Sequence, residues 1–584
     1  MNRHIPLFGL FFKFLLFDAI WCSYTTFTPF SDWESYATAL LATLALSLPY
    51  IWSRRPWVQT VVMALADIWM VCNLMYYRTY YSAIPPSSYF LAGNLADFLP
   101  SVTASIRWID LLFPLSTLLT AWLIHRLNDR KGRNINRLSF SASLVALAIL
   151  VGVVFSWQGG FVSRYRSLSL SAHAHASGPV LYTLFGTLWY NIADELPDLT
   201  EAQRSEIAAW LDAQPPLKPL EGVAERDNCI FILAESLESW CINLSVEGKE
   251  ITPHLNTLLR DSTTLYAPYV QTQVNGGRSI DGQLLTLAGL LPLQAGAYSC
   301  RYPQSTYLTL PKALKELKQT RNYLFTVDKS KTWNQDLVAK AFGIDTLLSY
   351  PNFQLVDGFG NRKRLGDKAF FRQCREKMTR GEVWPLGEKA FLQFVTYSGH
   401  SPFKLPEELK AIHFSDELPV MMNDYITMAH YTDEAIGEFI AYLKSRPDYE
   451  RTMIVITGDH EGLADNRQSL CQTPQGRGVI SDQEYTPFIV IHSPKGMVYD
   501  RVMGQVDIYP TLLQLMGVTD YVWHGLGQSI FDAEKRGVAV TPRQQLKGDT
   551  LNLPPHQREH LRQAPIISDR IIRFALLKEF HSEE

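Results

Sequence analysis

The sequence has few cysteines, and none is spaced as in a zinc-thiolate site. Seven cysteines are spread over 584 residues, and no two of them form a CxxC pair. This excludes the usual structural zinc domains. Basic residues are not in excess either, since the formal net charge is -3. Without a global basic surface, we expect no binding to nucleic acid.

Charged residues are also scarce in the first 157 residues, where the hydrophobic excess is concentrated. Five apolar segments there are each about long enough to cross a hydrocarbon core of about 30 Å. They cover roughly residues 5–22, 36–52, 57–76, 108–125 and 138–157. The ionisable residues within them are Lys13, Asp18, Asp67 and Asp110. Because charge is costly in lipid, we expect these side chains at packed or interfacial positions. The pattern predicts an α-helical membrane domain of five transmembrane helices.

Loop charge predicts the orientation of these helices. Residues 53–56 and 125–137 are rich in Lys and Arg, whereas residues 23–35 contain neither. Positively charged loops stay in the cytoplasm. We therefore expect a cytoplasmic N-terminus, with everything after Trp157 on the outer side. The further apolar segments, and the lack of a clear cleavage site, argue against a signal peptide.

The pattern changes at residue 228, where short apolar runs begin to alternate with helix-like segments. The expected strands are 229–234, 322–327, 391–396, 453–457 and 487–492. Such alternation is typical of an α/β domain with a mostly parallel central sheet. The expected domains are a membrane domain (1–157), a juxtamembrane helical linker (158–227), an extracytoplasmic domain (228–535) and a C-terminal tail (536–584).

Three side chains suited to binding a metal follow two of these strands. Glu235 follows the run CIFILA, while Asp459 and His460 follow MIVIT within TGDHEG. Strand ends of one sheet meet at one edge, where open α/β sheets bind their ligands. Carboxylate and imidazole groups suit Zn²⁺ or Mn²⁺. An Asp-His pair alone is also typical of a surface turn, and it is the additional Glu235 that favours a metal site.

A candidate nucleophile lies in VNGGRSIDGQLL, residues 274–285. Ser279 precedes a helix-like run, so its hydroxyl is expected near a helix N-terminus, which favours anions. A bound divalent metal could activate that hydroxyl, and Arg278 could clamp a phosphoryl oxygen. Ser279 could also be a simple N-cap, and the two roles are compatible.

Five motifs occur together: AESLESW, NGGRSIDG, KTWNQD, SGHSPF and TGDHEG. Their order and spacing resemble the lipoteichoic acid synthase-like phosphoglycerol transferases of the sulfatase and alkaline phosphatase superfamily. The resemblance implies a sulfatase-like catalytic domain and a multi-pass protein of the bacterial inner (cytoplasmic) membrane. It also implies one divalent ion, Mn²⁺ or Mg²⁺ with Zn²⁺ as a third candidate. The implied ligands are Glu235, Ser279, Asp459 and His460.

The resemblance further implies roles in the reaction. Ser279 would be the nucleophile and Trp333 would contact substrate, while His400 would contact the phosphoryl group or protonate the leaving group. A phospholipid would donate the head group to a glycan or glycolipid of the cell envelope. Three positions depart from the family pattern: Gln335 replaces a frequent arginine, Ala464 replaces a frequent serine, and Thr326 or Asp328 lies where a histidine is expected. The head group is therefore left open between phosphoglycerol and phosphoethanolamine.

Rival functions are a sulfatase, a phosphodiesterase that transfers the phosphoryl group to water, and a catalytically inactive lipid-binding protein. Sulfatases of this fold generally need a Cys/Ser-x-Pro-x-Arg signature, whereas the chain reads SIDGQ from Ser279. This argues against a sulfatase. The full set of candidate ligands argues against an inactive protein. The motifs do not distinguish a hydrolase from a transferase.

Overall fold

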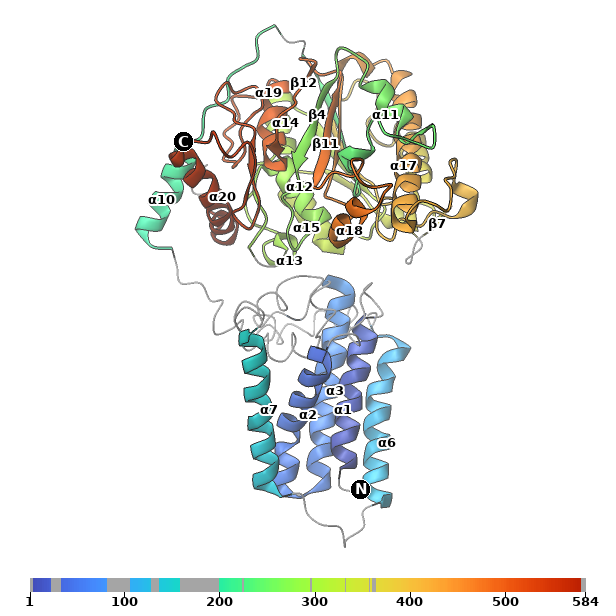
Figure 1. The fold of residues 1–584 in the computed structure, drawn as a ribbon, viewed down its shortest axis with the longest axis vertical. Helices are drawn as coiled ribbons and strands as arrows, with labels where there is room; N and C mark the ends of the chain where they lie inside the picture. Colours follow the sequence, from blue (N-terminus) through green and yellow to red (C-terminus); the bar gives the residue numbers. More distant parts are fainter. Residues whose placement is uncertain are drawn as a thin grey trace. The chain divides into compact units, whose positions relative to one another are not determined.

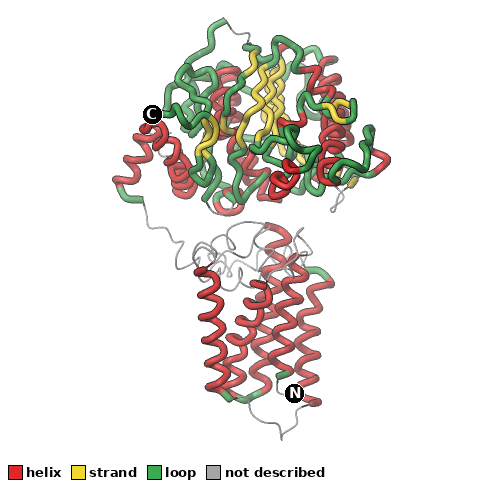
Figure 2. The backbone as a smooth tube through the Cα atoms, in the orientation of Figure 1, coloured by secondary structure: helices red, strands yellow, loops and turns green. Residues whose placement is uncertain are grey.

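The computed structural model describes residues 4–22, 33–80, 84, 106–127, 136–157, 199–222 and 225–578, the last range without 295–296, 331, 357 and 360–363. The chain divides into two compact units, Met1–Leu199 and Thr200–Glu584 (Figure 1). The first unit is helical in its described part. The second combines helices with a central sheet (Figure 2).

Each of the five expected spans corresponds to a helix. These are α1 (Ile5–Cys22), α2 (Trp33–Ser53), α3 (Pro56–Tyr80), α6 (Leu112–Leu127) and α7 (Arg137–Trp157). Four stretches within the described helices are long and apolar enough to cross a membrane: Tyr36–Ser53, Pro56–Met75, Trp108–Arg126 and Arg137–Val154. Helix α1 is not among the four. It packs with α2, α3 and α6 through an apolar cluster that includes Phe14, Phe17 and Trp21.

A buried polar network joins three of these helices. Lys13 on α1 forms an ion pair with Asp67 on α3 and donates to Thr117 Oγ1 on α6 at 2.6 Å. Lys13 also donates to the carbonyl of Phe113 at 2.9 Å, and Thr117 donates to Asp67 Oδ2 at 2.6 Å. Lys13 and Asp67 are therefore packed inside the helix bundle, as the sequence suggested, and each charge has its partner.

In the second unit, the sheet has the strand order β12-β4-β11-β10-β1-β9-β5-β6, and β13 pairs with β4. The strands are β1 (Asn228–Ala234), β4 (Leu265–Gln271), β5 (Arg321–Thr326), β6 (Thr346–Leu348), β9 (Ala390–Val395), β10 (Thr452–Gly458), β11 (Tyr485–Ile491), β12 (Met497–Val498) and β13 (Met503–Gly504). The strands from β10 to β6 are parallel, whereas β11 is antiparallel to β10 and β4. The predicted mostly parallel sheet is confirmed.

Helices cover both faces of this sheet (Figures 1 and 2). The main ones are α11 (Pro253–Leu258), α12 (Ser279–Ala288), α14 (Leu310–Lys318), α15 (Gln335–Ala341), α16 (Asp367–Thr379), α17 (Val420–Lys444) and α19 (Ile508–Leu515). Ile230 and Ile232 of β1 share a buried cluster with Phe371 of α16 and Phe439 of α17. Helices α12, α14 and α19 pack together on the other side of the sheet (Figure 1). Both faces of the central strands are thus buried.

The second unit also includes residues on either side of the sheet domain. Helix α10 (Glu201–Asp212) packs on α20 (Pro555–Phe574), where the ring of Trp210 stacks on His560 at 4.1 Å. The short strands β14 (Val538–Val540) and β15 (Leu546–Gly548) form a hairpin, and Gln273 donates to the carbonyl of Val540 at 2.7 Å. The remaining regular elements are α13 (Tyr298–Arg301), α18 (Arg467–Gln472), β2 (Ser245–Val246), β3 (Lys249–Glu250), β7 (Gly358–Phe359) and β8 (Arg364–Leu365).

The membrane network generates a stability prediction. Lys13→Met should destabilise the helical unit by about 3–5 kcal/mol, because Asp67 then remains buried without a cation. Thermal unfolding in detergent would measure this. The double variant Lys13→Met/Asp67→Leu should recover much of the loss, since it leaves no buried charge. Equal destabilisation in the single and double variants would contradict this account.

Candidate metal and nucleophile site

The carboxyl ends of neighbouring parallel strands bring the candidate ligands together. Ala234 at the end of β1 lies opposite Gly458 at the end of β10. Glu235 and Asp459 therefore leave adjacent strands at the same edge. On the other side of β1, Thr396 follows β9, and its hydroxyl accepts the backbone N–H of Glu235 at 3.0 Å.

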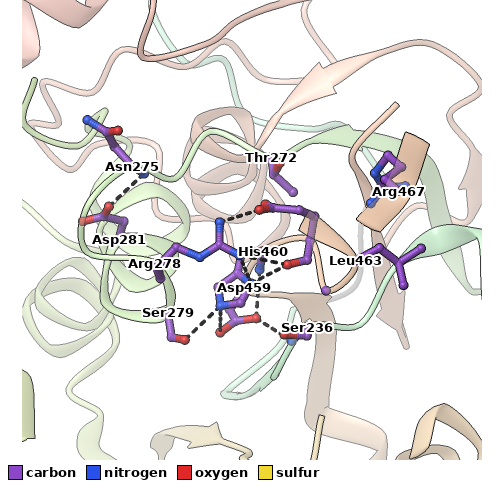
Figure 3. Close-up of polar contacts among 12 residues, drawn as sticks. Ser236, Thr272, Asn275, Arg278, Ser279, Asp281, Asp459, His460, Leu463 and Arg467 are labelled. Carbon is purple, nitrogen blue, oxygen red and sulfur yellow. Dashed lines mark hydrogen bonds and ion pairs between the residues drawn. The ribbon is translucent and has the colours of Figure 1, made fainter. Parts of the chain in front are cut away.

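All four predicted ligands converge at this edge. Ligand atoms of Glu235, Asp459 and His460 lie within 4.8 Å of one another. The Ser279 hydroxyl lies 3.1 Å from both Glu235 Oε2 and His460 Nε2. Figure 3 shows Ser279, Asp459 and His460 directed toward one another. Within the described part of the chain, no other group of three or more His, Cys, Asp and Glu side chains is arranged to hold a metal.

The donor set fits a divalent cation. Asp459 Oδ2 is buried, and no hydrogen-bond donor among the described residues reaches it. An unpaired carboxylate oxygen in a buried position is costly unless a cation or proton occupies it. His460 Nδ1 lies 2.8 Å from the carbonyl of Glu461. An Nδ1–H donated to that carbonyl leaves the Nε2 lone pair directed at the cluster, as in metal-bound histidines.

Burial and mutual repulsion set the protonation of these groups. Burial, reinforced by the Asp459 carboxylate, raises the pKa of Glu235 well above its usual value. Burial lowers the pKa of His460 and keeps its imidazole neutral near pH 7. Without a cation, the carboxylate pair therefore retains a proton. With a cation, that proton must leave.

Surrounding contacts orient these ligands. Asp459 Oδ1 accepts the backbone N–H groups of Ser236 and His460 at 2.7 and 2.8 Å. Arg278 forms an ion pair with Glu461 and donates to the Glu461 carbonyl at 3.1 Å. Burial would raise the pKa of Glu461, but the Arg278 charge outweighs it and lowers that pKa. Glu461 thus holds the Arg278 guanidinium beside His460, and the distance between Arg278 Nη2 and His460 Nδ1 is 3.2 Å.

Ser279 is not an N-cap. It is the first residue of α12, and the capping position belongs to Arg278, whose φ of 50° lies in the left-handed region. The Ser279 hydroxyl faces Glu235 and His460 instead. The turn before it is held by Asp281, whose Oδ2 accepts the backbone N–H of Asn275 at 3.0 Å and of Gly277 at 2.9 Å.

Trp333 and His400 lie outside the ligand cluster. Trp333 is half-buried in a short turn (Thr332–Asn334) after β5, and it has a left-handed φ of 55°. His400 follows β9 and is exposed; its ring stacks on Tyr397 at 5.4 Å. Within the described part of the chain, neither residue forms a hydrogen bond or an ion pair with the four ligands. His400 follows β9, which pairs with β1, and Trp333 follows β5, which pairs with β9 on its far side; these parallel strands end at the same edge of the sheet.

Glu238 has a role that the sequence did not reveal. It is fully buried and forms an ion pair with Arg467. Its Oε1 accepts the N–H groups of Gly462 and Leu463 at 2.7 and 2.9 Å. Glu238 therefore stabilises the loop that follows the Asp459-His460 pair. These partners lie more than two hundred residues away in the sequence, so no local pattern could identify them.

Comparison with known proteins identifies the family to which this fold belongs. The family model described as Sulfatase matches residues 227–518, half of the chain. The chain belongs to the sulfatase family. A second model, the lipoteichoic acid synthase N-terminal domain, matches residues 2–196. Together these matches confirm a lipoteichoic acid synthase-like member of the sulfatase and alkaline phosphatase superfamily.

Individual relatives support the same assignment. Lipoteichoic acid synthase 2 of Bacillus subtilis (strain 168) is 26% identical over 495 residues, 82% of this chain and 74% of that protein. Lipoteichoic acid synthase of Staphylococcus aureus (strain NCTC 8325 / PS 47) is 25% identical over 493 residues, 81% of this chain and 75% of that protein. The crystal structure of the lipoteichoic acid synthase LtaP from Listeria monocytogenes has a TM-score of 0.54 at 18% identity, covering 63% of this chain and 98% of that chain. This structural likeness confirms the sulfatase-like fold.

The raised pKa of Glu235 predicts how metal affinity depends on pH. Mn²⁺ should bind more tightly as the pH rises toward the raised pKa of Glu235, by up to about tenfold per unit, because the cation must displace a proton. His460 does not add to this competition, since its pKa is lowered. Titration calorimetry on the detergent-purified chain in buffers of different ionisation enthalpy would count the released protons. Asp459→Asn should weaken binding at every pH, and a pH-independent Kd would contradict the prediction.

Proposed function

We propose that this protein is a membrane-anchored phosphotransferase. It moves a phosphoglycerol or phosphoethanolamine head group from a phospholipid to a glycan or glycolipid of the cell envelope. The observation that carries the proposal is the Ser279 hydroxyl, 3.1 Å from both Glu235 and His460 in a cluster suited to a divalent cation. The relatives named lipoteichoic acid synthase support the same class of reaction.

The first half of the proposed reaction forms a covalent intermediate. Ser279 Oγ loses its proton to solvent and attacks the phosphorus of the donor. The bond between phosphorus and the diacylglycerol oxygen breaks, and that oxygen takes a proton from His400. In the second half, an acceptor hydroxyl gives its proton to His400 and attacks the phosphorus, and the bond to Ser279 breaks, which restores the deprotonated Ser279 oxygen and the protonated His400. A bound Mn²⁺ or Mg²⁺, with Zn²⁺ as a third candidate, would lower the pKa of the Ser279 hydroxyl and offset phosphoryl charge.

Charge placement around Ser279 supports these roles. Arg278 precedes the nucleophile and is fixed by Glu461, so its guanidinium can contact a phosphoryl oxygen without reorganising. Trp333, in the turn after β5, would contact the donor or the acceptor. Glu235, Asp459 and His460, with Ser279 itself, would hold the ion.

Membrane anchoring suits a lipid donor. The N-terminal helices include four stretches able to cross a membrane. A catalytic unit tethered to the bilayer meets its donor at high effective concentration. We propose a multi-pass protein of the bacterial inner membrane with its catalytic unit outside the cytoplasm, because the basic loops favour that orientation.

The covalent step can be tested by intact-mass spectrometry of the detergent-purified chain with Mn²⁺. Exposure to phosphatidylglycerol and, separately, to phosphatidylethanolamine should give an adduct on Ser279 with one of them. The mass identifies the head group. Ser279→Ala should lose the adduct and lower turnover by at least about a thousandfold, because the attacking oxygen is gone.

A matched control is Ser568→Ala, which removes another serine hydroxyl, bound to the Leu291 carbonyl at 2.7 Å in the interior. This variant should still form the adduct. Turnover that survives in Ser279→Ala would refute the nucleophile assignment. Release of the free phosphorylated head group without transfer to an acceptor would favour a phosphodiesterase, and cleavage of sulfate esters alone would favour a sulfatase.

A further inference from the structure

Two buried glutamines form a reciprocal amide pair near the candidate nucleophile. Gln283 Nε2 donates to Gln335 Oε1 at 2.9 Å, and Gln335 Nε2 donates back to Gln283 Oε1 at 3.2 Å. Their exposed fractions are 3% and 6%. Each carboxamide thus accepts one hydrogen bond from the other and donates one to it. Removing either side chain therefore leaves the remaining buried carboxamide without these two hydrogen bonds.

The positions of these glutamines connect two parts of the site. Gln283 lies four residues after Ser279 in α12, so both side chains lie on the same face of that helix, one turn apart. Gln335 is the first residue of α15 and directly follows the Trp333 turn. The pair therefore joins the helix that carries the nucleophile to the turn that carries Trp333.

That turn has a backbone which needs external restraint. Trp333 and Asn334 both adopt left-handed conformations, with φ of 55° and 51°. Such residues are strained and persist only where surrounding contacts over-determine them. One restraint is Asn334, which donates to the Ser299 carbonyl at 3.0 Å. Another long-range restraint is the glutamine pair, which leads to α12.

We propose that the Gln283–Gln335 pair is a positioning element, which fixes the Trp333 turn relative to the Ser279 hydroxyl and so aligns the bound substrate for attack. This rests on the proposed function. Misplacement of a substrate by about 1 Å can cost about a hundredfold in rate. The side chain of Gln335 is uncharged and holds the turn through its amide.

The test combines single and double replacements by leucine. Gln283→Leu or Gln335→Leu leaves one buried carboxamide without its partner, so each should lower both the Tm and the turnover of phosphatidylglycerol, the latter about tenfold or more. The double variant leaves no orphaned amide and should recover much of the Tm. It should not recover turnover, because two leucines make no directional contact. Recovery of turnover together with Tm would reduce the pair to a stability role and overturn the proposal.

Hydrogen exchange provides a readout independent of catalysis. In both single variants and in the double variant, exchange in residues 329–336 should accelerate about tenfold or more, while Mn²⁺ affinity stays unchanged. Unchanged exchange there would overturn the proposal, even if turnover falls. If the wild-type chain releases no diacylglycerol from phosphatidylglycerol, the proposed function fails, and the exchange result still decides whether the pair holds the turn.

The matched control is Gln514→Leu. Gln514 is a buried glutamine on α19 whose amide donates to the Lys218 carbonyl at 2.6 Å and, among the described residues, forms no hydrogen bond with α12 or with the Trp333 turn. Its replacement should lower the Tm without changing turnover or the exchange of residues 329–336. Equal loss of turnover in this variant would mean that any buried glutamine has the same effect.

Discussion

Repulsion between two desolvated carboxylates is the constraint on which the site depends. Glu235 and Asp459 leave adjacent strands, and each has a carboxylate oxygen within 3.5 Å of His460 Nε2. Two buried negative charges this close are not stable without a cation or a proton between them. The neutral imidazole and the Ser279 hydroxyl complete a donor set of mixed nitrogen and oxygen atoms, which suits a small divalent ion.

The backbone is packed tightly enough to hold this unfavourable arrangement. A Cβ atom at Gly399 would lie 1.9 Å from the carbonyl oxygen of Glu235, and one at Gly458 would lie 2.1 Å from that of Leu237. These two glycines let the loops after β9 and β10 approach the loop after β1. Glu238 then fixes the loop after His460 by accepting hydrogen bonds from the backbone N–H groups of Gly462 and Leu463. The ligands therefore converge because the loops that carry them cannot move apart independently.

The helical unit also contains buried charges, but there each charge is paired with an opposite one. Lys13 and Asp67 lie inside a bundle of apolar helices, where each is satisfied by the other and by Thr117. The candidate metal site keeps its carboxylates incompletely paired, and Asp459 Oδ2 accepts no hydrogen bond from any described residue. A fully satisfied network stabilises a structure, whereas an unsatisfied one has capacity to bind a ligand. This contrast separates the structural charges of the chain from the candidate functional ones.

The sequence by itself determined the order of the two units, five of the sheet strands and the four candidate ligands. These features depend on local sequence. The length of an apolar run indicates a membrane span or a buried strand, and a polar motif directly after a strand indicates residues at the edge of the sheet. Strand β4 was not predicted, because Pro268 interrupts its apolar pattern. Only the tertiary structure decided that Ser279 faces the ligands, that Glu238 anchors a loop and that Gln283 pairs with Gln335. Each of these contacts joins residues far apart in the chain, so it depends on how helices pack against the sheet.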